Sequence, residues 1–455
     1  MVRLLRQRGY RPILWLCILD FWLSVIAGAA GLNLSWAQWP LWAYTPEIIL
    51  FAASVMLSSY ACGLYRWRHV WSYADTVVRS AVAMLIAFAM LAIILYTFSG
   101  LTIYRSAVAV SFPLLFITFL ITRRLFLLLL DRGLIRRRIL VLGVGENATR
   151  LLRLERGSRS RRFRFVGFID VCGEQPCIAE ECIVQISGSL PEMVDSLHAD
   201  EILLAAGERR GSLPLPSLIE CRLGGVQVTS YQVFCERELG RIDHDALRPD
   251  WFFTEGFLGG PWRMSLKRGL DVACSVLLLC VSWPLIVATG VAIGIESPGG
   301  VLYRQERRGL RGRNFHLTKF RSMYQDAERD GPRWADEKDP RVTAIGRIIR
   351  ATRIDEIPQL LNVLKGEMSF VGPRPERPHF VEQIGQSIRF YEERHYMKPG
   401  ITGWAQLNYP YGASLLDAKR KLEYDLFYLK YFSIVLDLLI ILQTLRIILW
   451  REGVR

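Results

Sequence analysis

Two adjacent acidic residues, Asp355 and Glu356, lie among arginines in the C-terminal half of the sequence. Arg350 and Arg353 precede them, and a Gly-Pro-Arg-Pro turn at 372–375 follows. Arginines bind phosphate through paired N–H groups, while carboxylates bind divalent cations or attack phosphorus. The same residues would also suit a surface helix with ion pairs three and four residues apart. The pattern therefore predicts either a site that handles phosphate or an ordinary charged helix.

Short elements should position this pair. We expect a helix over 344–353, in which arginines spaced by three, among them Arg350 and Arg353, share one face. Pro358 is typical of the first turn of a following helix. A carboxylate at a helix start faces the positive end of the helix dipole, so we expect lowered pKa values for the pair and an ionised Asp355.

Residues 301–323 predict two strands joined by a basic turn. Lys319 and Arg321 lie on the opposite strand face from Phe320, so one of them can reach the acidic pair. The turn is either a solvated hairpin or a patch on lipid headgroups, and a neighbouring apolar segment favours the lipid.

The whole chain is both basic and apolar, with 455 residues, a formal net charge of +14 and 51% hydrophobic residues. This combination is unusual for a soluble enzyme and suits a membrane protein whose cytoplasmic face meets anionic lipid. We therefore expect membrane lipid, and no nucleic acid, as the partner of this charge. The nine cysteines predict neither a disulfide framework nor a metal site.

Four apolar runs, each near the length that crosses a bilayer, occupy the N-terminal part. They are 13–32, 48–64, 77–98 and 107–130. Lysine and arginine alternate between the connecting loops, which predicts a four-helix transmembrane bundle over 1–132 with both of its ends cytoplasmic.

A fifth apolar run, 272–295, has basic residues on both flanks, so a simple span would violate the positive-inside rule. Pro284 kinks a helix, and Ser282 can satisfy a freed carbonyl. We expect a bent re-entrant helix over about 266–296 with both ends cytoplasmic; a kinked full span is the alternative. The last run, 434–450, predicts an amphipathic helix at the interface.

Between the apolar regions, 137–250 alternates strand and helix patterns and predicts a small Rossmann-like α/β domain. Gly143, Gly145 and Ala148 match the G-x-G-x-x-A turn of nucleotide-binding folds, and Asp170 is placed for a ribose contact. A scaffold that regulates or dimerises is the favoured alternative. None of the 17 tyrosines has lysine four residues on, which argues against redox chemistry on a sugar. The expected strands begin at Arg138 and cover 163–170, 201–205 and 226–230.

Four motifs of the C-terminal half resemble the bacterial sugar transferases, the polyprenyl-phosphate hexose-1-phosphate transferases, over about 262–455. The motifs are Lys-Phe-Arg-Ser-Met at 319–323, Asp-Glu-Ile-Pro-Gln at 355–359, Gly-Pro-Arg-Pro at 372–375 and Lys-Pro-Gly-Ile-Thr-Gly-Trp at 398–404. The N-terminal half is similar to that of the long, exopolysaccharide-type members of the family.

The resemblance implies a monotopic phosphoglycosyl transferase that moves sugar-1-phosphate from a UDP-sugar to undecaprenyl phosphate and releases UMP. It assigns the attack on phosphorus to Asp355, with Glu356 as its partner, and favours Lys319 as a phosphate contact. Because both substrates are anionic, we expect Mg²⁺ on the two carboxylates. The expected phosphate or substrate contacts are Lys319, Arg321, Arg350, Arg353 and Arg374.

A loop rich in Gly, Pro and aromatic residues, 395–412, either recognises uridine or sugar or simply packs Trp404. Asp425 and Asp437 also fit the family pattern, without an assigned role.

The predicted architecture is therefore a membrane α-helical bundle, a Rossmann-like middle domain (137–250) and an α+β catalytic domain (262–455) on the cytoplasmic face of the bacterial inner membrane. The enzyme would initiate an exopolysaccharide, O-antigen or capsule repeat. The alternatives are a nonenzymatic scaffold or regulator of polysaccharide assembly and a membrane enzyme that modifies nucleotide sugars. The sequence fixes neither the sugar nor the oligomeric state, and a homodimer is compatible with it.

Overall fold

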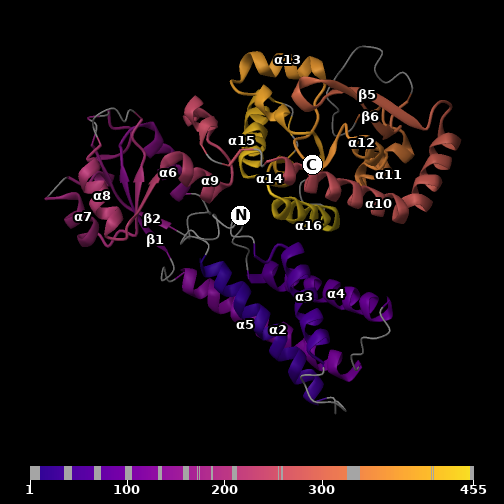
Figure 1. Cartoon of the computed structure of the whole chain (residues 1–455), viewed down its shortest axis with the longest axis horizontal. Helices are drawn as coiled ribbons and strands as arrows, with labels where there is room; N and C mark the ends of the chain where they lie inside the picture. The colour runs from indigo at the N-terminus through magenta and orange to yellow at the C-terminus, as the bar shows by residue number, and fades with distance from the viewer. Residues whose placement is uncertain are drawn as a thin grey trace. The chain divides into compact units, whose positions relative to one another are not determined.

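The structure is a computed structural model that describes part of the chain (Figure 1). The described residues are 11–34, 44–65, 73–97, 105–131, 136–156, 163–171, 173, 175–185, 188–207, 213–254, 256–257, 260–324, 339–410, 412 and 414–450. They divide into two compact units, Val2–Leu239 and Gly240–Arg455. Residues from Gly240 on, which the sequence analysis placed in the middle domain, therefore cluster with the C-terminal unit.

Among the residues that the structure describes, the first unit contains four apolar helices before its sheet, as predicted. They are α2 (Arg11–Leu34), α3 (Thr45–Ala61), α4 (Tyr73–Thr97) and α5 (Arg105–Asp131). By length and composition, α2, α4 and α5 can each cross a membrane, and α3, with 17 residues, is shorter. Their shared core contains Phe51, Leu115 and Phe119. The rest of each helix surface is largely apolar and exposed, as expected for helices that face lipid.

A charged pair joins two of these helices inside their bundle. Arg123 Nη2 on α5 lies 2.6 Å from Asp20 Oδ2 on α2, and both side chains are almost completely buried. The hydroxyl of Tyr65 donates to the same carboxylate at 2.8 Å. Charges inside an apolar bundle occur where they are paired, so this contact fixes the register of α2 against α5.

The remainder of this unit is a parallel sheet with helices between its strands. The strands are β1 (Arg137–Leu142), β2 (Phe163–Ile169), β3 (Glu201–Leu204) and β4 (Gln227–Ser230), close to their predicted positions. The helices are α6 (Glu146–Arg156), α7 (Leu190–Ser196), α8 (Leu215–Leu223) and α9 (Tyr231–Leu239), with a turn η4 (Glu180–Cys182). The strand order is β2-β1-β3-β4. The strand order therefore reverses at β1: β2 lies on one side of it, and β3 and β4 lie on the other. Ligands of such sheets bind where the order reverses.

The glycine turn after β1 packs tightly against the chain that leaves β3. Gly143 has φ +126°, and a Cβ there would lie 2.6 Å from the amide nitrogen of Ala206. Residues other than glycine rarely adopt this backbone conformation. Gly143 is therefore required for the close packing of β1 and β3, whether or not the turn binds a nucleotide.

The second unit mixes short strands with helices, in keeping with the α+β domain predicted for this half of the chain. Its strands are β5 (Leu302–Arg308), β6 (Asn314–Phe320), β7 (Ser369–Val371) and β8 (Gly400–Thr402). Its helices are α10 (Pro261–Glu296), α11 (Ala344–Ala351), α12 (Gln359–Lys365), α13 (Pro378–Ser387), α14 (Trp404–Asn408), α15 (Leu415–Tyr431) and α16 (Ile434–Trp450). Short turns are η5 (His244–Ala246), η6 (Pro249–Phe253), η7 (Leu310–Gly312), η8 (Ile354–Glu356) and η9 (Glu392–Tyr396). The main core forms around α15, where Leu422, Leu426 and Tyr428 are buried.

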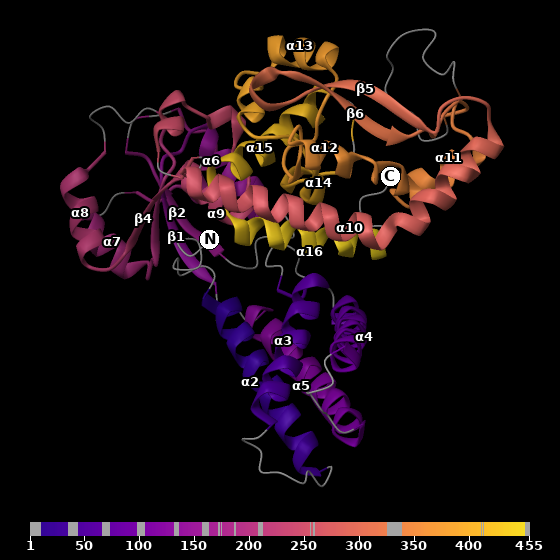
Figure 2. The same ribbon diagram turned by 45° about the vertical axis from the view of Figure 1, so that its right-hand side comes forward.

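Helix α10 is long and apolar, and it is attached to the second unit at both ends. Near its start, Arg268 donates to the carbonyls of Val363 and Leu364 at the end of α12, at 2.5 and 2.7 Å. At its other end, Glu296 accepts the backbone amide of Ile345 in α11 at 2.8 Å. Most side chains between these anchors are apolar and exposed. Figure 2 shows the axis of α10 turning along its length.

At the bend of α10, the hydrogen bond of Ser282 differs from the one expected. Pro284 lies inside the helix and cannot donate to the carbonyl of Cys280. The Ser282 hydroxyl, expected to satisfy a freed carbonyl, donates instead to that of Leu278 at 2.6 Å. Ser282 therefore bonds one turn back along its own helix, a contact that often accompanies helix bending.

Replacing Gly143 should loosen the sheet of the first unit. Gly143→Ala adds both a strained φ and a clash with Ala206, so we expect a loss of about 3 kcal/mol of local stability. Hydrogen exchange of β1 and β3 in the full chain measures this. Gly225→Ala is the control, because Gly225 also has a positive φ (+95°) but no atom near the added Cβ; its cost should be about 1 kcal/mol. Equal exchange in both variants would contradict the packing argument.

Candidate active site

Three basic side chains meet at one oxygen of Glu356. Lys319 Nζ lies 3.0 Å from Glu356 Oε1. Arg374 Nη2 lies 3.2 Å from the same oxygen, and Arg353 Nη1 lies 3.5 Å away. These residues come from β6, from the turn after β7 and from the chain before η8. From three segments of the chain, the fold thus gathers five of the seven predicted site residues, Lys319, Arg353, Asp355, Glu356 and Arg374.

The backbone at Arg353 differs from the predicted helix over 344–353. Helix α11 ends at Ala351, and Arg353 adopts a left-handed conformation with φ +60°. Such a conformation is uncommon for a residue with a side chain. Arg353 therefore does not continue a helical row with Arg350; the reversed backbone instead turns it toward Glu356.

A close backbone contact sets the position of α11. The Thr343 hydroxyl accepts the amide of Gly346 at 2.9 Å and caps the helix. A Cβ at position 346 would lie 2.1 Å from the carbonyl oxygen of Ser322. Gly346 thus lets α11 lie directly against the chain that leaves β6, which carries Lys319.

Glycines also hold the turn that carries Arg374. Gly372 donates to the carbonyl of Thr402 at 2.9 Å, and Gly400 donates to that of Pro373 at 2.8 Å. A Cβ on Gly372 would lie 2.3 Å from the carbonyl oxygen of Lys398. The predicted Gly-Pro-Arg-Pro and Lys-Pro-Gly motifs are therefore two sides of one backbone junction.

The two carboxylates have opposite pKa shifts. Burial alone would raise the pKa of Glu356, but the charges of Lys319, Arg374 and Arg353 outweigh it and hold that pKa well below its usual range. Burial raises the pKa of Asp355, and the neighbouring Glu356 raises it further, against the opposing charge of Lys319. The expectation of a lowered pKa for Asp355 is wrong, because burial of the side chain outweighs any effect of a helix start.

Asp355 differs from Glu356 in its contacts as well. The residue is 7% exposed, and its buried oxygen Oδ1 has no hydrogen-bond partner among the described residues. A buried carboxylate oxygen without a partner is costly unless a ligand completes it. It can coordinate a cation or attack an electrophile.

The residues fit a Mg²⁺ ion only in part. Within the described part of the chain, no three His, Cys, Asp or Glu side chains gather as a metal-binding group. Glu356 is already surrounded by cations, so Asp355 offers the open oxygen. This suits Mg²⁺, which commonly binds one or two carboxylates and takes its other ligands from substrate phosphates and water.

Two of the expected phosphate contacts lie in other surroundings. Arg321 is buried and donates to the carbonyls of Ser297 and Pro298, both at 2.7 Å, just after α10. Arg350 lies near Asp339, whose pKa is lowered by hydrogen bonds from Arg341 and, more weakly, by the charge of Arg350. The sequence pattern did not separate these arginines from the ones that reach Glu356.

The loop over 395–412 packs largely against its own unit. Trp404 stacks on Phe427 with ring centroids 5.9 Å apart, and its indole N–H donates to the carbonyl of Gly240 at 2.8 Å. Burial and the charge of Arg394 lower the pKa of His395 to about 3, so this histidine is neutral at physiological pH. These contacts match the alternative in which the loop packs Trp404.

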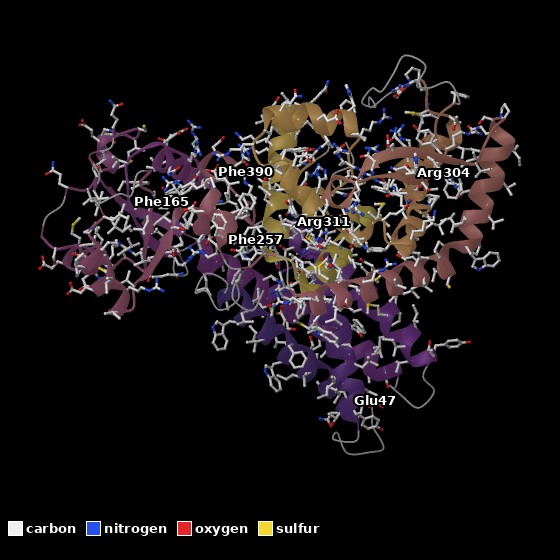
Figure 3. All side chains as sticks on the ribbon, turned by 45° about the horizontal axis from the view of Figure 1, so that its top comes forward. Glu47, Phe165, Phe257, Arg304, Arg311 and Phe390 are labelled. Atoms are coloured by element: carbon white, nitrogen blue, oxygen red, sulfur yellow. The ribbon has the colours of Figure 1, made fainter. Side chains whose placement is uncertain are left out.

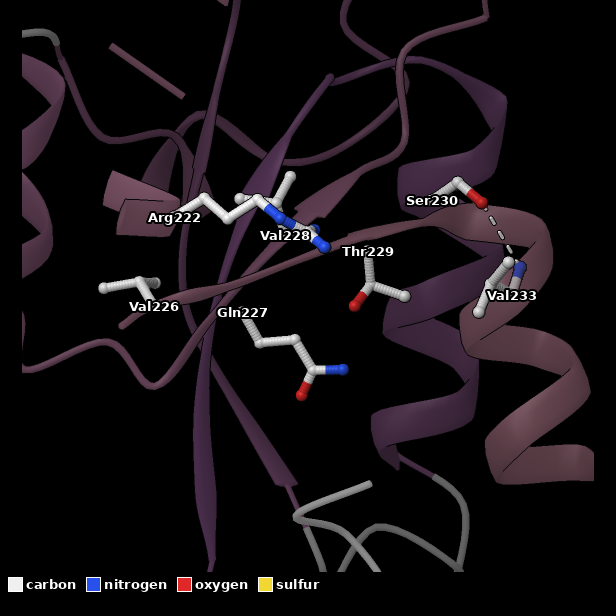
Figure 4. A pocket seen from close by; sticks show the side chains of 7 residues that line it. All are labelled: Arg222, Val226, Gln227, Val228, Thr229, Ser230 and Val233. Carbon is white, nitrogen blue, oxygen red and sulfur yellow. Dashed lines mark hydrogen bonds between the residues drawn. The ribbon is translucent and has the colours of Figure 1, made fainter. Parts of the chain in front are cut away.

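The middle sheet offers a separate hollow of about 420 Å³ along the edge strand β4 (Figure 4). Its lining residues are Arg222, Val226, Gln227, Val228, Thr229, Ser230 and Val233. It includes neither the glycine turn nor Asp170, whose carboxylate accepts the amide of Gly173 at 2.8 Å. The hollow therefore does not coincide with the nucleotide site that the turn predicts.

The basic hairpin β5–β6 forms in the predicted place. Arg304 on β5 and Arg311 in the turn, both labelled in Figure 3, are exposed. Arg311 adopts φ +52°. An exposed basic hairpin is compatible with either solvent or lipid headgroups.

Comparisons with known proteins single out this unit. A family model described as bacterial sugar transferase matches residues 262–451. A UDP-N-acetylgalactosamine-undecaprenyl-phosphate N-acetylgalactosaminephosphotransferase of Aeromonas hydrophila is 42% identical over 238 residues, 52% of this chain and 56% of that protein. An undecaprenyl-phosphate glucose phosphotransferase of Komagataeibacter xylinus is 36% identical over 329 residues, 68% of this chain and 58% of that protein.

A shorter relative is covered almost completely. The sugar transferase EpsL of Bacillus subtilis, whose name calls it uncharacterised, is 40% identical over 192 residues, 42% of this chain and 91% of that protein. The chain thus spans a little over half the length of the first two relatives and nearly all of the third.

Removing the charge of Glu356 should destabilise the second unit in a way that depends on pH. Glu356→Gln leaves three cations without their anion, so we expect a loss of about 3 kcal/mol near neutral pH. Because folding depresses this pKa, the stabilisation is present above the ordinary glutamate pKa of about 4.3 and is lost as pH falls toward the depressed value. The stability difference from wild type should therefore shrink below about pH 4. Thermal unfolding from neutral to acidic pH measures it.

Glu423→Gln is the matched control. Burial raises the pKa of Glu423, against the opposing charges of Arg241 and Arg420. Wild type should therefore gain stability relative to Glu423→Gln as pH falls, the opposite trend. Parallel trends in the two variants would show that the cations do not govern the ionisation of Glu356.

Proposed function

Because the chain belongs to the bacterial sugar transferase family, we propose that it transfers sugar-1-phosphate from a UDP-sugar to undecaprenyl phosphate and releases UMP. The names of two relatives support these substrate classes. They differ in the sugar, glucose in one and N-acetylgalactosamine in the other, so the sugar of this chain is left to experiment. The step would start an exopolysaccharide, O-antigen or capsule repeat.

The observation that carries the proposal is the contrast between the two carboxylates. Glu356 is ionised and held by three cations, which makes it a poor nucleophile. Asp355 has a buried, unpartnered oxygen and a raised pKa. A poorly solvated carboxylate with no competing hydrogen bond is the better nucleophile of the two. We therefore assign attack to Asp355 and charge organisation to Glu356.

The reaction then divides into two displacements. In the first, an Asp355 oxygen bonds to the sugar-bearing phosphorus of the UDP-sugar, and the bond from that phosphorus to the UMP oxygen breaks. UMP leaves with the electron pair. In the second, an oxygen of undecaprenyl phosphate bonds to the same phosphorus, the bond to Asp355 breaks, and the carboxylate returns. No histidine base is needed, since the lipid phosphate is already ionised.

The cations would screen the repulsion between the two phosphates. Lys319, Arg353 and Arg374 present N–H donors beside Asp355, and donors fixed before the reaction stabilise developing charge most effectively. When bound by Asp355, Mg²⁺ would supply further charge neutralisation on the phosphate oxygens. Burial lowers the pKa of Lys319, but Glu356 opposes this shift, so the ammonium keeps an anionic partner until substrate binds.

The attachment of α10 supports a re-entrant helix. Its start is tied to α12 through Arg268, and its end is tied to α11 through Glu296. Because one compact unit holds both ends, a full span would require parts of that unit on both sides of the bilayer. We propose that α10 enters and leaves the cytoplasmic leaflet and that the unit lies on the cytoplasmic face of the inner membrane.

For the middle sheet we propose a Rossmann-like scaffold rather than a second catalytic centre. The required Gly143 has a packing role, and Asp170 bonds within its own turn. A nonenzymatic scaffold for the whole chain is the competing function. The complete set of Lys319, Asp355, Glu356 and Arg374 argues against it, because a degenerate site has no need of this charge arrangement.

Substituting the nucleophile tests the function. Asp355→Asn keeps the shape but removes the charge, so UMP release should fall at least ~10³-fold, roughly 4 kcal/mol of barrier. Wild type given UDP-sugar alone should release one UMP per active site and gain the mass of a sugar phosphate. Intact-protein mass spectrometry across a panel of UDP-sugars also identifies the sugar.

The exposed Asp245→Asn is a control for that assay, and its activity should match wild type. If wild type forms no adduct and its kinetics require both substrates together, direct transfer is correct. Asp355 would then serve only as a metal ligand or an electrostatic group.

Membrane topology gives an independent test of the re-entrant helix. In a variant without native cysteines, single cysteines at Gly260 and Val301 should both resist a membrane-impermeant thiol reagent added outside intact cells. Both should react after the membrane is opened. Gly260 has no atom near an added Cβ, so this cysteine should be tolerated. Labelling of one position but not the other in intact cells would establish a full span.

A further inference from the structure

The turn that carries Arg374 is held at four successive carbonyl groups. The carbonyl of Pro373 accepts the amide of Gly400 at 2.8 Å, and that of Glu376 accepts the amide of Arg308 at 2.9 Å. The two carbonyls between them accept arginine side chains instead. Since Pro373 and Pro375 have no N–H, these two residues can be held by backbone hydrogen bonds only at their carbonyl groups.

The arginine on the Arg374 carbonyl is Arg394. Its Nη2 donates to that oxygen at 3.1 Å. Its Nη1 donates to the Tyr391 hydroxyl at 2.7 Å, and its Nε donates to Asp425 Oδ2 at 3.0 Å. Both charged side chains are nearly inaccessible to solvent, Arg394 at 5% and Asp425 at 2%. Nη2 also lies 2.7 Å from Asp425 Oδ2, so the carboxylate holds the edge of the guanidinium that faces the Arg374 carbonyl.

The contact between Arg394 and Asp425 also connects the Arg374 turn to the core of the unit. Asp425 lies on α15, in the main core of the unit. Arg394 therefore links a helix of the main core to the backbone of a residue whose side chain reaches Glu356. A shift of the Arg374 carbonyl would move its guanidinium relative to Asp355 and the phosphate. Displacements of about 1 Å in an active site can cost about 10²-fold in rate.

We propose that Arg394, oriented by Asp425, is a positioning residue that fixes Arg374 for phosphoryl transfer. The inference rests on the proposed function and adds two residues to it. Neither residue touches Asp355 or Glu356 in any contact of the described structure, so both act through Arg374. This also gives Asp425 a role that the sequence alone did not supply.

The test compares two buried carboxylates on the same helix. Asp425 and Glu423 both lie on α15 and both pair with arginines, but Glu423 pairs with Arg241 and Arg420, away from the turn. Asp425→Asn and Glu423→Gln should lower the thermal stability of the full-length enzyme to a similar extent. Only Asp425→Asn should lower kcat for UMP release, by about 10- to 50-fold, with a smaller change in KM for the UDP-sugar.

A double-mutant cycle then separates positioning from general destabilisation. Arg394→Lys keeps the charge but cannot bond Asp425, Tyr391 and the Arg374 carbonyl together. It should lower kcat/KM by about 30-fold in the wild-type background, yet by no more than about 3-fold when Arg374 is already alanine. Arg374→Ala alone should retain about 1% of activity, enough to measure.

Equal losses from Arg394→Lys in both backgrounds would overturn the inference, as would equal activity losses in Asp425→Asn and Glu423→Gln. Either result, with an active wild type, leaves the proposed function intact. A wild type that releases no UMP with any UDP-sugar would refute the proposed function and this inference with it.

Discussion

The arrangement of the candidate active site depends on the carboxylate of Glu356, which holds three cations from three separate segments. Without it, Lys319, Arg353 and Arg374 would repel one another and turn toward solvent. With it, they remain clustered before any substrate arrives. A phosphate bound there would meet donors that are already oriented, so little reorganisation would be needed. The cost of burying Glu356 is offset by its partners, as its lowered pKa indicates.

Backbone features secure what the charges alone cannot. Arg353 adopts a left-handed conformation that stops α11 early and turns the side chain back. Gly346 and Gly372 allow backbones to approach so closely that no Cβ would fit. Strained or crowded backbone of this kind persists only where the surrounding structure enforces it. Here the enforcing elements include α10, whose Lys267 donates to the carbonyl of Val371, next to Gly372, at 2.9 Å. The apolar helix and the active site are thus parts of one packed body.

Much of this was accessible from the sequence. Apolar runs predicted the helices of the first unit, alternating patterns predicted the four parallel strands, and adjacent carboxylates among arginines marked the candidate site. The predictions that the structure contradicts were drawn from local sequence patterns. A spacing of three placed Arg350 and Arg353 on one helix face, but the helix ends between them. A helix start suggested a lowered pKa for Asp355, but burial raises it. Arg321 looked equivalent to Lys319, yet it caps the chain that leaves α10.

The sequence by itself determined which chemistry was available, because residue type decides whether a group can bind phosphate, carry a proton or cross a membrane. It also determined the local elements, since hydrophobic periodicity and turn residues act over a few positions. Only the tertiary structure decided how the two carboxylates differ in burial and pairing, and which basic side chains lie beside Glu356. Burial and pairing depend on residues that are distant in sequence, such as Lys319, Arg374 and Asp425. Packing of the fold sets how close these residues come to one another in space. Free energies of desolvation and ion pairing follow that packing, so no local pattern could have fixed them.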